Sequence, residues 1–205
     1  CWGWGSSSEE CGPLPESGGG LARAEGHAGE VQQADAEALP YPDAGWEAVR
    51  STVGVMFTPN QEKAAAELAR VGKPGGSIGL ANWTPDSFIG QVFKPIGKYP
   101  PPAAGVKSPA LWGTHARLNE LFGSGARAIR TTSREFTFRY RSPAHFIDVF
   151  RTYYGPMNKT FAALDIDKQA AFTRDLLALM QGRNRSGDAT LVLPSEYLEV
   201  VIERK

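Results

Sequence analysis

The sequence has little of several features that would point to particular classes of protein. Its 205 residues hold only two cysteines, Cys1 and Cys11, so a disulfide scaffold is not indicated and a reduced, cytoplasmic chain is expected. Lys plus Arg number 22, as do Asp plus Glu, and this balance gives no electrostatic case for nucleic acid or an anionic membrane. No apolar run approaches the ~20 residues of a spanning helix, and no secretory signal pattern is present.

The first 29 residues differ in composition from the rest of the chain. Residues 1–30 contain no Val, Ile, Phe, Tyr or Met, and five Glu stand against one Arg. Such a stretch cannot bury enough apolar surface to offset its ordering entropy. The "ESGGG" within it is not favoured as a phosphate-binding loop, because no strand pattern precedes it. A disordered tail over 1–29 and a folded domain over 30–205 are therefore expected.

From Glu30 onward the chain alternates strand and helix patterns. β-Branched and aromatic residues favour a strand within 46–57. A helix is expected over 58–76, with Thr58 or Asn60 as its cap and its end before Pro74. Strand, helix and strand with short links form a right-handed crossover and hence a parallel pair. Further strands are expected at 30–34, 77–83, 126–141 and 196–205, and further helices at 85–98, at 114–123 and as a group of three within 142–184.

Four motifs within this pattern resemble those of a known family. They are "DAEALPYPD" (35–43), "STVGVMF" (51–57), "RVGKPGG" (70–76) and "IGLANWTP" (78–85). In this order and spacing they resemble the second half of a class I S-adenosylmethionine-dependent methyltransferase of the UbiE-like type, over roughly residues 31–205. The resemblance implies an α/β fold, with a Rossmann-like, doubly wound, mainly parallel sheet of seven strands whose last strand is antiparallel and inserted between its neighbours. It also implies a helical cap at 142–184.

The resemblance implies that S-adenosylmethionine is the cofactor and that it lies across the carboxyl ends of the strands, where ligands of open α/β sheets bind. Asp35 matches the acid that accepts a hydrogen bond from the adenine amino group. Ala36 matches the residue whose backbone meets the ring edge, and Leu39 the apolar wall beside it. The segment that lines the methionine end and the methyl group corresponds to Ser51, Val53 and Gly54.

The substrate is expected to be a small molecule, held in a mainly apolar pocket under the cap. Tyr153 and Tyr154 are adjacent and so face different sides of a helix, which leaves at most one of them for the pocket. Trp83 and Trp112 are further pocket candidates, although large aromatic residues more often fill the core. No acid–base pair stands out, so no catalytic residue is assigned, and neither a metal site nor an oligomeric state is indicated.

One departure from the family pattern leaves two functions open. The glycine-rich loop "D-x-G-x-G-x-G" after the first strand of the family is absent, as is the strand whose terminal acid holds the ribose, so the fold is expected to be incomplete at the N-terminus. The chain is either a small-molecule methyltransferase or a non-catalytic remnant that acts as a binding module, and it is expected to bind S-adenosylmethionine weakly. A dinucleotide-dependent dehydrogenase is less favoured, because no G-x-G-x-x-G follows a strand.

Overall fold

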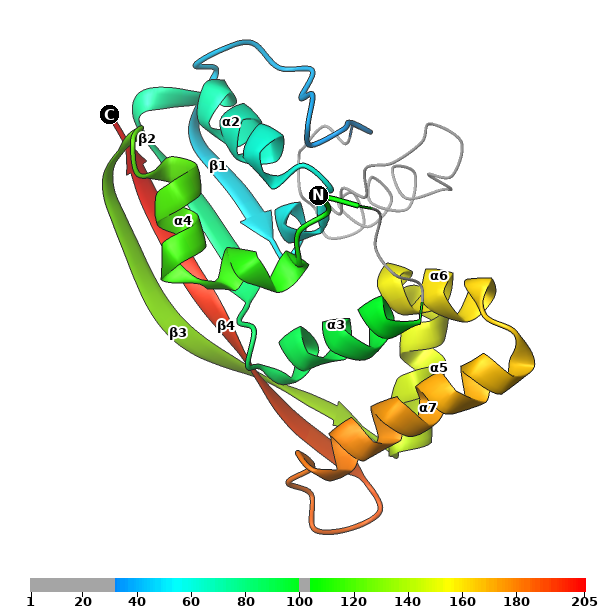
Figure 1. Ribbon diagram of the computed structural model, residues 1–205. Helices are drawn as coiled ribbons and strands as arrows, with labels where there is room; N and C mark the ends of the chain where they lie inside the picture. The colour runs from blue at the N-terminus through cyan, green and yellow to red at the C-terminus, as the bar shows by residue number, and fades with distance from the viewer. Residues whose placement is uncertain (1–31, 100–103) are drawn as a thin grey trace.

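The computed structural model describes residues 32–99 and 104–205. The tail expected over 1–29, with both cysteines, lies outside the described residues. Within them the chain forms one mixed sheet with strand order β1-β2-β4-β3, shown in Figure 1. The strands are β1 (Trp46–Thr52), β2 (Gly72–Trp83), β3 (Ala126–Tyr140) and β4 (Leu191–Arg204).

Strand directions agree with the sheet that the sequence indicated. β1 and β2 are parallel, whereas β4 is antiparallel to both of its neighbours, β2 and β3. Three strands therefore share one direction, and the last strand of the chain runs against them between β2 and β3. The α/β class and the inserted antiparallel strand are confirmed, while the described residues supply four strands of the seven that were expected.

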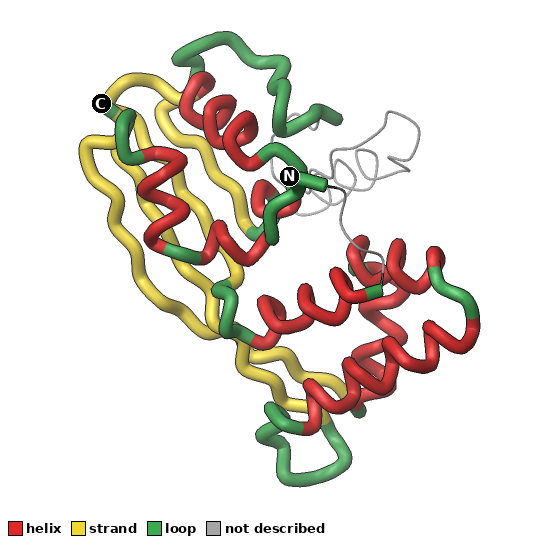
Figure 2. Tube along the Cα trace, in the orientation of Figure 1, coloured by secondary structure: helices red, strands yellow, loops and turns green. Residues whose placement is uncertain are grey.

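The helices fall into two groups, which Figure 2 separates clearly. Helices α2 (Gln61–Val71) and α4 (His115–Phe122) lie over one face of the sheet, while the other four pack together beyond the ends of β1 and β2 (Figure 1). No described helix has both the length and the apolar character needed to cross a membrane. The second group consists of α3 (Phe88–Lys98), α5 (Pro143–Tyr153), α6 (Gly155–Ala163) and α7 (Ile166–Gln181), and the short 3-10 helices are η1 (Val55–Phe57) and η2 (Pro109–Gly113).

The two faces of the sheet differ in how well they are covered. Ile78, Leu80 and Val200 point toward the helices and are almost completely buried. On the other face, Arg50, Val201 and Arg130 lie in one cross-strand row and are half-buried or exposed. A doubly wound sheet has helices on both faces, whereas within the described ranges helices cover one face of this sheet.

Element boundaries differ from the expected ones in four places. The strand expected at 30–34 is absent over its described part, Gln32–Ala34, because this backbone has no neighbouring strand there. β1 ends at Thr52, since Val53 adopts a φ of 54° and the chain turns into η1. β2 and β4 begin earlier than expected, at Gly72 and Leu191. Helix α2 spans Gln61–Val71, within the expected 58–76. It is capped by the side chain of Asn60, one of the two expected caps, and ends before Pro74 as expected.

A buried arginine joins the two helices that cover the sheet. Arg117 of α4 donates from Nε to Gln61 Oε1 at 2.9 Å and from Nη2 to Glu62 Oε1 at 2.7 Å, both on α2. Its Nη1 also donates to Glu120 Oε2 at 2.9 Å. Only 7% of the Arg117 side chain is exposed, so the charge depends on these acceptors in place of water.

We expect Arg117→Ala to lower the free energy of unfolding by about 2–4 kcal/mol, because it leaves the buried Gln61 amide without its partner. Arg130→Ala is the matched control, since Arg130 pairs with Glu203 on the exposed sheet face and surface pairs contribute about 0–1 kcal/mol. Urea unfolding of both variants measures the difference. Equal losses would contradict a structural role for the Arg117 contacts.

Candidate functional site

The segment that begins at Asp35 forms a tight turn on the surface. Oδ1 of Asp35 accepts a hydrogen bond from the Glu37 amide at 2.8 Å, and the Ala38 amide donates to the Asp35 carbonyl at 3.0 Å. This arrangement leaves the second carboxylate oxygen of Asp35 and the Ala36 N–H without a partner among the described residues. The turn therefore presents two groups from adjacent residues: a carboxylate oxygen of exposed Asp35 as an acceptor, and the backbone N–H of Ala36 as a donor.

Helix α2 holds the rest of this loop. The Leu39 amide donates to Glu67 Oε2 at 2.7 Å, while Arg70 donates to the Leu39 and Tyr41 carbonyls at 2.9 and 2.7 Å. Arg70 also pairs with Glu67 and Asp43, each at 2.7 Å. The hydrogen bond from Arg70 is the main reason that the pKa of Glu67 lies below its usual range. Sequence reasoning missed Glu67 and Arg70, whose i,i+3 spacing is common on exposed helix faces.

The chain turns sharply where β1 ends, at the same rim of the sheet. Ser51 Oγ accepts from the Val55 amide at 2.9 Å, and the Val53 amide donates to the Ala81 carbonyl of β2 at 2.8 Å. Val53 has a φ of 54°, which is unfavourable for a β-branched residue, and Gly54 next to it is buried. Backbone strain of this kind gathers at functional sites. One compact turn thus contains Ser51, Val53 and Gly54. A common role in lining one part of a ligand requires them to lie close together in this way.

Aromatic packing connects this turn to the helices of the expected cap. Phe57, at the end of η1, lies edge-on to Phe93 of α3 and to Tyr154, with ring centroids 5.7 and 6.1 Å apart. The Tyr154 hydroxyl is enclosed and has no hydrogen-bond partner among the described residues, and burial raises its pKa. Tyr153 is 81% exposed. The adjacent tyrosines therefore do face different sides, and Tyr154 is the one directed inward.

The two tryptophan candidates lie in the core. Trp83, at the end of β2, packs against Phe138 and Tyr197 with centroids 5.7 and 6.0 Å away. Trp112 of η2 is fully buried beside Phe122. A Cβ at position 113 would overlap the Trp83 carbonyl, so Gly113 permits η2 to approach β2 closely. These contacts account for the packing of both rings, although Trp112 Nε1 is buried without a hydrogen-bond partner among the described residues.

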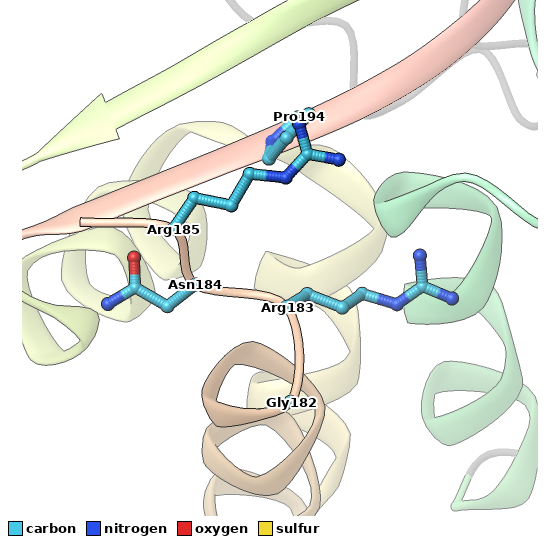
Figure 3. Close-up of a pocket in the computed structure, with 5 residues that line it drawn as sticks. All are labelled: Gly182, Arg183, Asn184, Arg185 and Pro194. Atoms are coloured by element: carbon cyan, nitrogen blue, oxygen red, sulfur yellow. The ribbon is translucent and has the colours of Figure 1, made fainter. Parts of the chain in front are cut away.

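A surface hollow of about 270 Å³ lies elsewhere, at the loop that follows α7 (Figure 3). Arg183 and Arg185 extend from this loop along the same side, while the side chain of Asn184 accepts from the Val192 amide at 2.8 Å and fixes the loop to β4. A neighbouring hollow of about 410 Å³ is lined by residues of α7 and the same loop. None of the ten candidate residues lines either hollow, so the predicted site and these hollows are separate.

Comparison with known proteins supports a methyltransferase. Residues 17–80 match the profile of a family described as "Methyltransferase domain", and over 69 residues the chain is 36% identical to the ubiquinone/menaquinone biosynthesis C-methyltransferase UbiE of Cronobacter sakazakii, covering 34% of this chain and 26% of that protein. Over these residues the chain is similar to this methyltransferase family. The profile match includes the motif at 35–43 and begins within the stretch that was expected to form a tail.

Longer matches extend the similarity beyond these residues. The chain is 32% identical over 178 residues to the uncharacterized protein Rv1405c of Mycobacterium tuberculosis, which covers 86% of this chain and 64% of that relative. It therefore spans less than two thirds of the relative's length. The solved structure of the YcgJ protein from Bacillus subtilis aligns with a TM-score of 0.57 at 14% identity, over 95% of this chain and 80% of that one. At this identity the likeness establishes the Rossmann-like methyltransferase fold alone.

The strain at Val53 has a measurable consequence. Val53→Gly removes a half-buried side chain but relieves the unfavourable φ, whereas Val49→Gly in β1 removes a similar side chain with no such relief. We expect Val53→Gly to cost about 1–2 kcal/mol less stability than Val49→Gly. Chemical denaturation of the two variants gives the difference, and equal losses would mean that Val53 stores no strain.

Proposed function

We propose that the chain binds S-adenosylmethionine along the rim formed by residues 35–54 and takes part in transferring its methyl group to a small molecule. The observation that carries this proposal is the turn at Asp35 and Ala36. Its second carboxylate oxygen and the Ala36 N–H, which have no partner among the described residues, suit the adenine edge, which offers an amino donor beside a ring-nitrogen acceptor. The residues that are present thus fit the adenine end of the cofactor, and Leu39 supports the apolar side of the ring.

The methyl end of the cofactor would lie at the turn formed by Ser51, Val53 and Gly54. This turn stands at the carboxyl end of a parallel strand, where open α/β sheets bind their ligands. Its shape is fixed by the hydrogen bonds of Ser51 and Val53, and a fixed wall favours alignment of the reacting atoms. Bound S-adenosylmethionine would supply an electrophilic methyl group on a sulfonium, and the residues of this chain would orient the reactants and exclude water.

The helices within 142–184 would form the cap over a small, mainly apolar acceptor. Tyr154 faces the η1 side through Phe57, whereas Tyr153 projects to solvent, so Tyr154 is the better candidate to meet the acceptor. Trp83 and Trp112 would shape the wall from behind, through their packing. No described acid–base pair adjoins the Val53 turn, and we assign the protein a role in positioning without naming a catalytic base.

A binding module without catalysis is the second candidate function. The observation in its favour is that no described acid–base pair adjoins the Val53 turn, although the turn at Asp35 offers hydrogen-bonding groups. Weak cofactor binding with no methyl transfer from labelled S-adenosylmethionine to apolar aromatic acceptors would favour this second function over the first.

An NMR titration of the chain with S-adenosylmethionine tests the binding proposal. We expect a weak complex, with a Kd on the order of 1 mM, and shifts concentrated at 35–39 and 51–54. Asp35→Ala should weaken binding by about 1–3 kcal/mol, because the adenine amino group loses its acceptor. Tyr153→Phe, at an exposed position, is the control and should bind as the parent does. Absent or scattered shifts would contradict the proposal.

A further inference from the structure

The loop over 35–43 has no strand of its own to hold it. Apart from the bonds within the turn at Asp35, the hydrogen bonds of this loop among the described residues are made to helix α2 or to Asn60, which caps that helix. At one end, Glu37 Oε1 accepts from the amide of Asn60, the N-cap of α2, at 2.8 Å. At the other end, the Ala44 amide donates to the Arg70 carbonyl at 2.8 Å. The loop is therefore fastened at both ends of a helix that is about 16 Å long.

Arg70 is the centre of the second attachment. Its guanidinium group reaches two loop carbonyls, those of Leu39 and Tyr41, and the carboxylates of Asp43 and Glu67. Only a planar group with several fixed donors satisfies so many acceptors at once, and lysine cannot reproduce this geometry. Glu67 holds the guanidinium from the helix side while also accepting the Leu39 amide. With side chains 30% and 16% exposed, the pair is partly shielded from solvent.

We propose that Arg70, supported by Glu67, is a positioning residue for recognition of the adenine base. This inference rests on the proposed function and goes beyond it. It assigns the selectivity for adenine to helix α2, which would act through the loop at 35–43 and not by contact with the base. The position of the Asp35–Ala36 turn is set by α2 and not by the sheet. Displacing the loop would therefore move the free carboxylate oxygen and the free N–H away from the base edge together.

The chemistry of the base makes this role measurable. Adenine carries a 6-amino donor, which a carboxylate accepts, whereas hypoxanthine carries a 6-oxo acceptor, which a carboxylate repels. A correctly placed Asp35 turn must therefore prefer an adenosyl ligand to its inosyl counterpart. A misplaced turn loses this preference, even where the rest of the ligand still binds.

The experiment compares S-adenosylhomocysteine with S-inosylhomocysteine by NMR titration of the full chain, in the parent and three variants. The variants are Arg70→Ala, Arg70→Lys and, as the matched control, Lys63→Ala, which removes an exposed cation from the same helix. Hydrogen exchange of the Leu39 amide reports on the loop without ligand. Thermal unfolding checks that each variant is folded.

We expect the parent to prefer the adenosyl ligand by about tenfold or more. In Arg70→Ala the preference for the adenosyl ligand should fall below about threefold, and the Leu39 amide should exchange about tenfold faster. Arg70→Lys should recover part of the preference and part of the protection from exchange. Lys63→Ala should change neither the preference nor the exchange rate. An undiminished preference in Arg70→Ala, with binding retained, would overturn the role of Arg70 alone. A parent chain that binds neither ligand would overturn both this role and the proposed function.

Discussion

Strand β4 is the element on which the rest of the described structure depends. It pairs with β2 from Ser77 to Trp83 and with β3 from Ala126 to Tyr140, so every β-ladder beyond the β1–β2 pair includes it. Its buried residues Leu198, Val200 and Ile202 also form the floor on which the covering helices pack. Because this strand comes last in the chain, the sheet that carries the candidate site is completed by the final residues of the sequence.

Much of the architecture could be predicted because its signals are local. The cap at Asn60 and the proline at 74 define α2, and alternation with β-branched residues defines the later strands. The loop at 35–43 could not be predicted in the same way. Its backbone partners, Glu67 and Arg70, lie 28 to 31 positions along the chain.

The candidate site was predictable to a different extent at each of its ends. At the proposed adenine end the motif named Asp35, Ala36 and Leu39, but not the helix that holds this loop. At the proposed methyl end it named Ser51, Val53 and Gly54, which the fold does gather into one turn. The positive φ at Val53 leaves no signature in the sequence, since valine is disfavoured there and glycine or asparagine is the usual occupant. Among the aromatic candidates, Tyr153 is exposed whereas Trp83 and Trp112 are buried, and residue type alone does not reveal this difference.

The ring of Phe57 has a mechanical consequence. It stands between Phe93 of α3 and Tyr154 at the start of α6, only four positions after the strained residue Val53. Close-packed interiors transmit displacement because they have few voids to absorb it. A movement of these helices would therefore displace the short 3-10 helix and the turn at Val53. The packing of Phe57 thus couples the position of α3 and of the chain at Tyr154 to the shape of this strained turn.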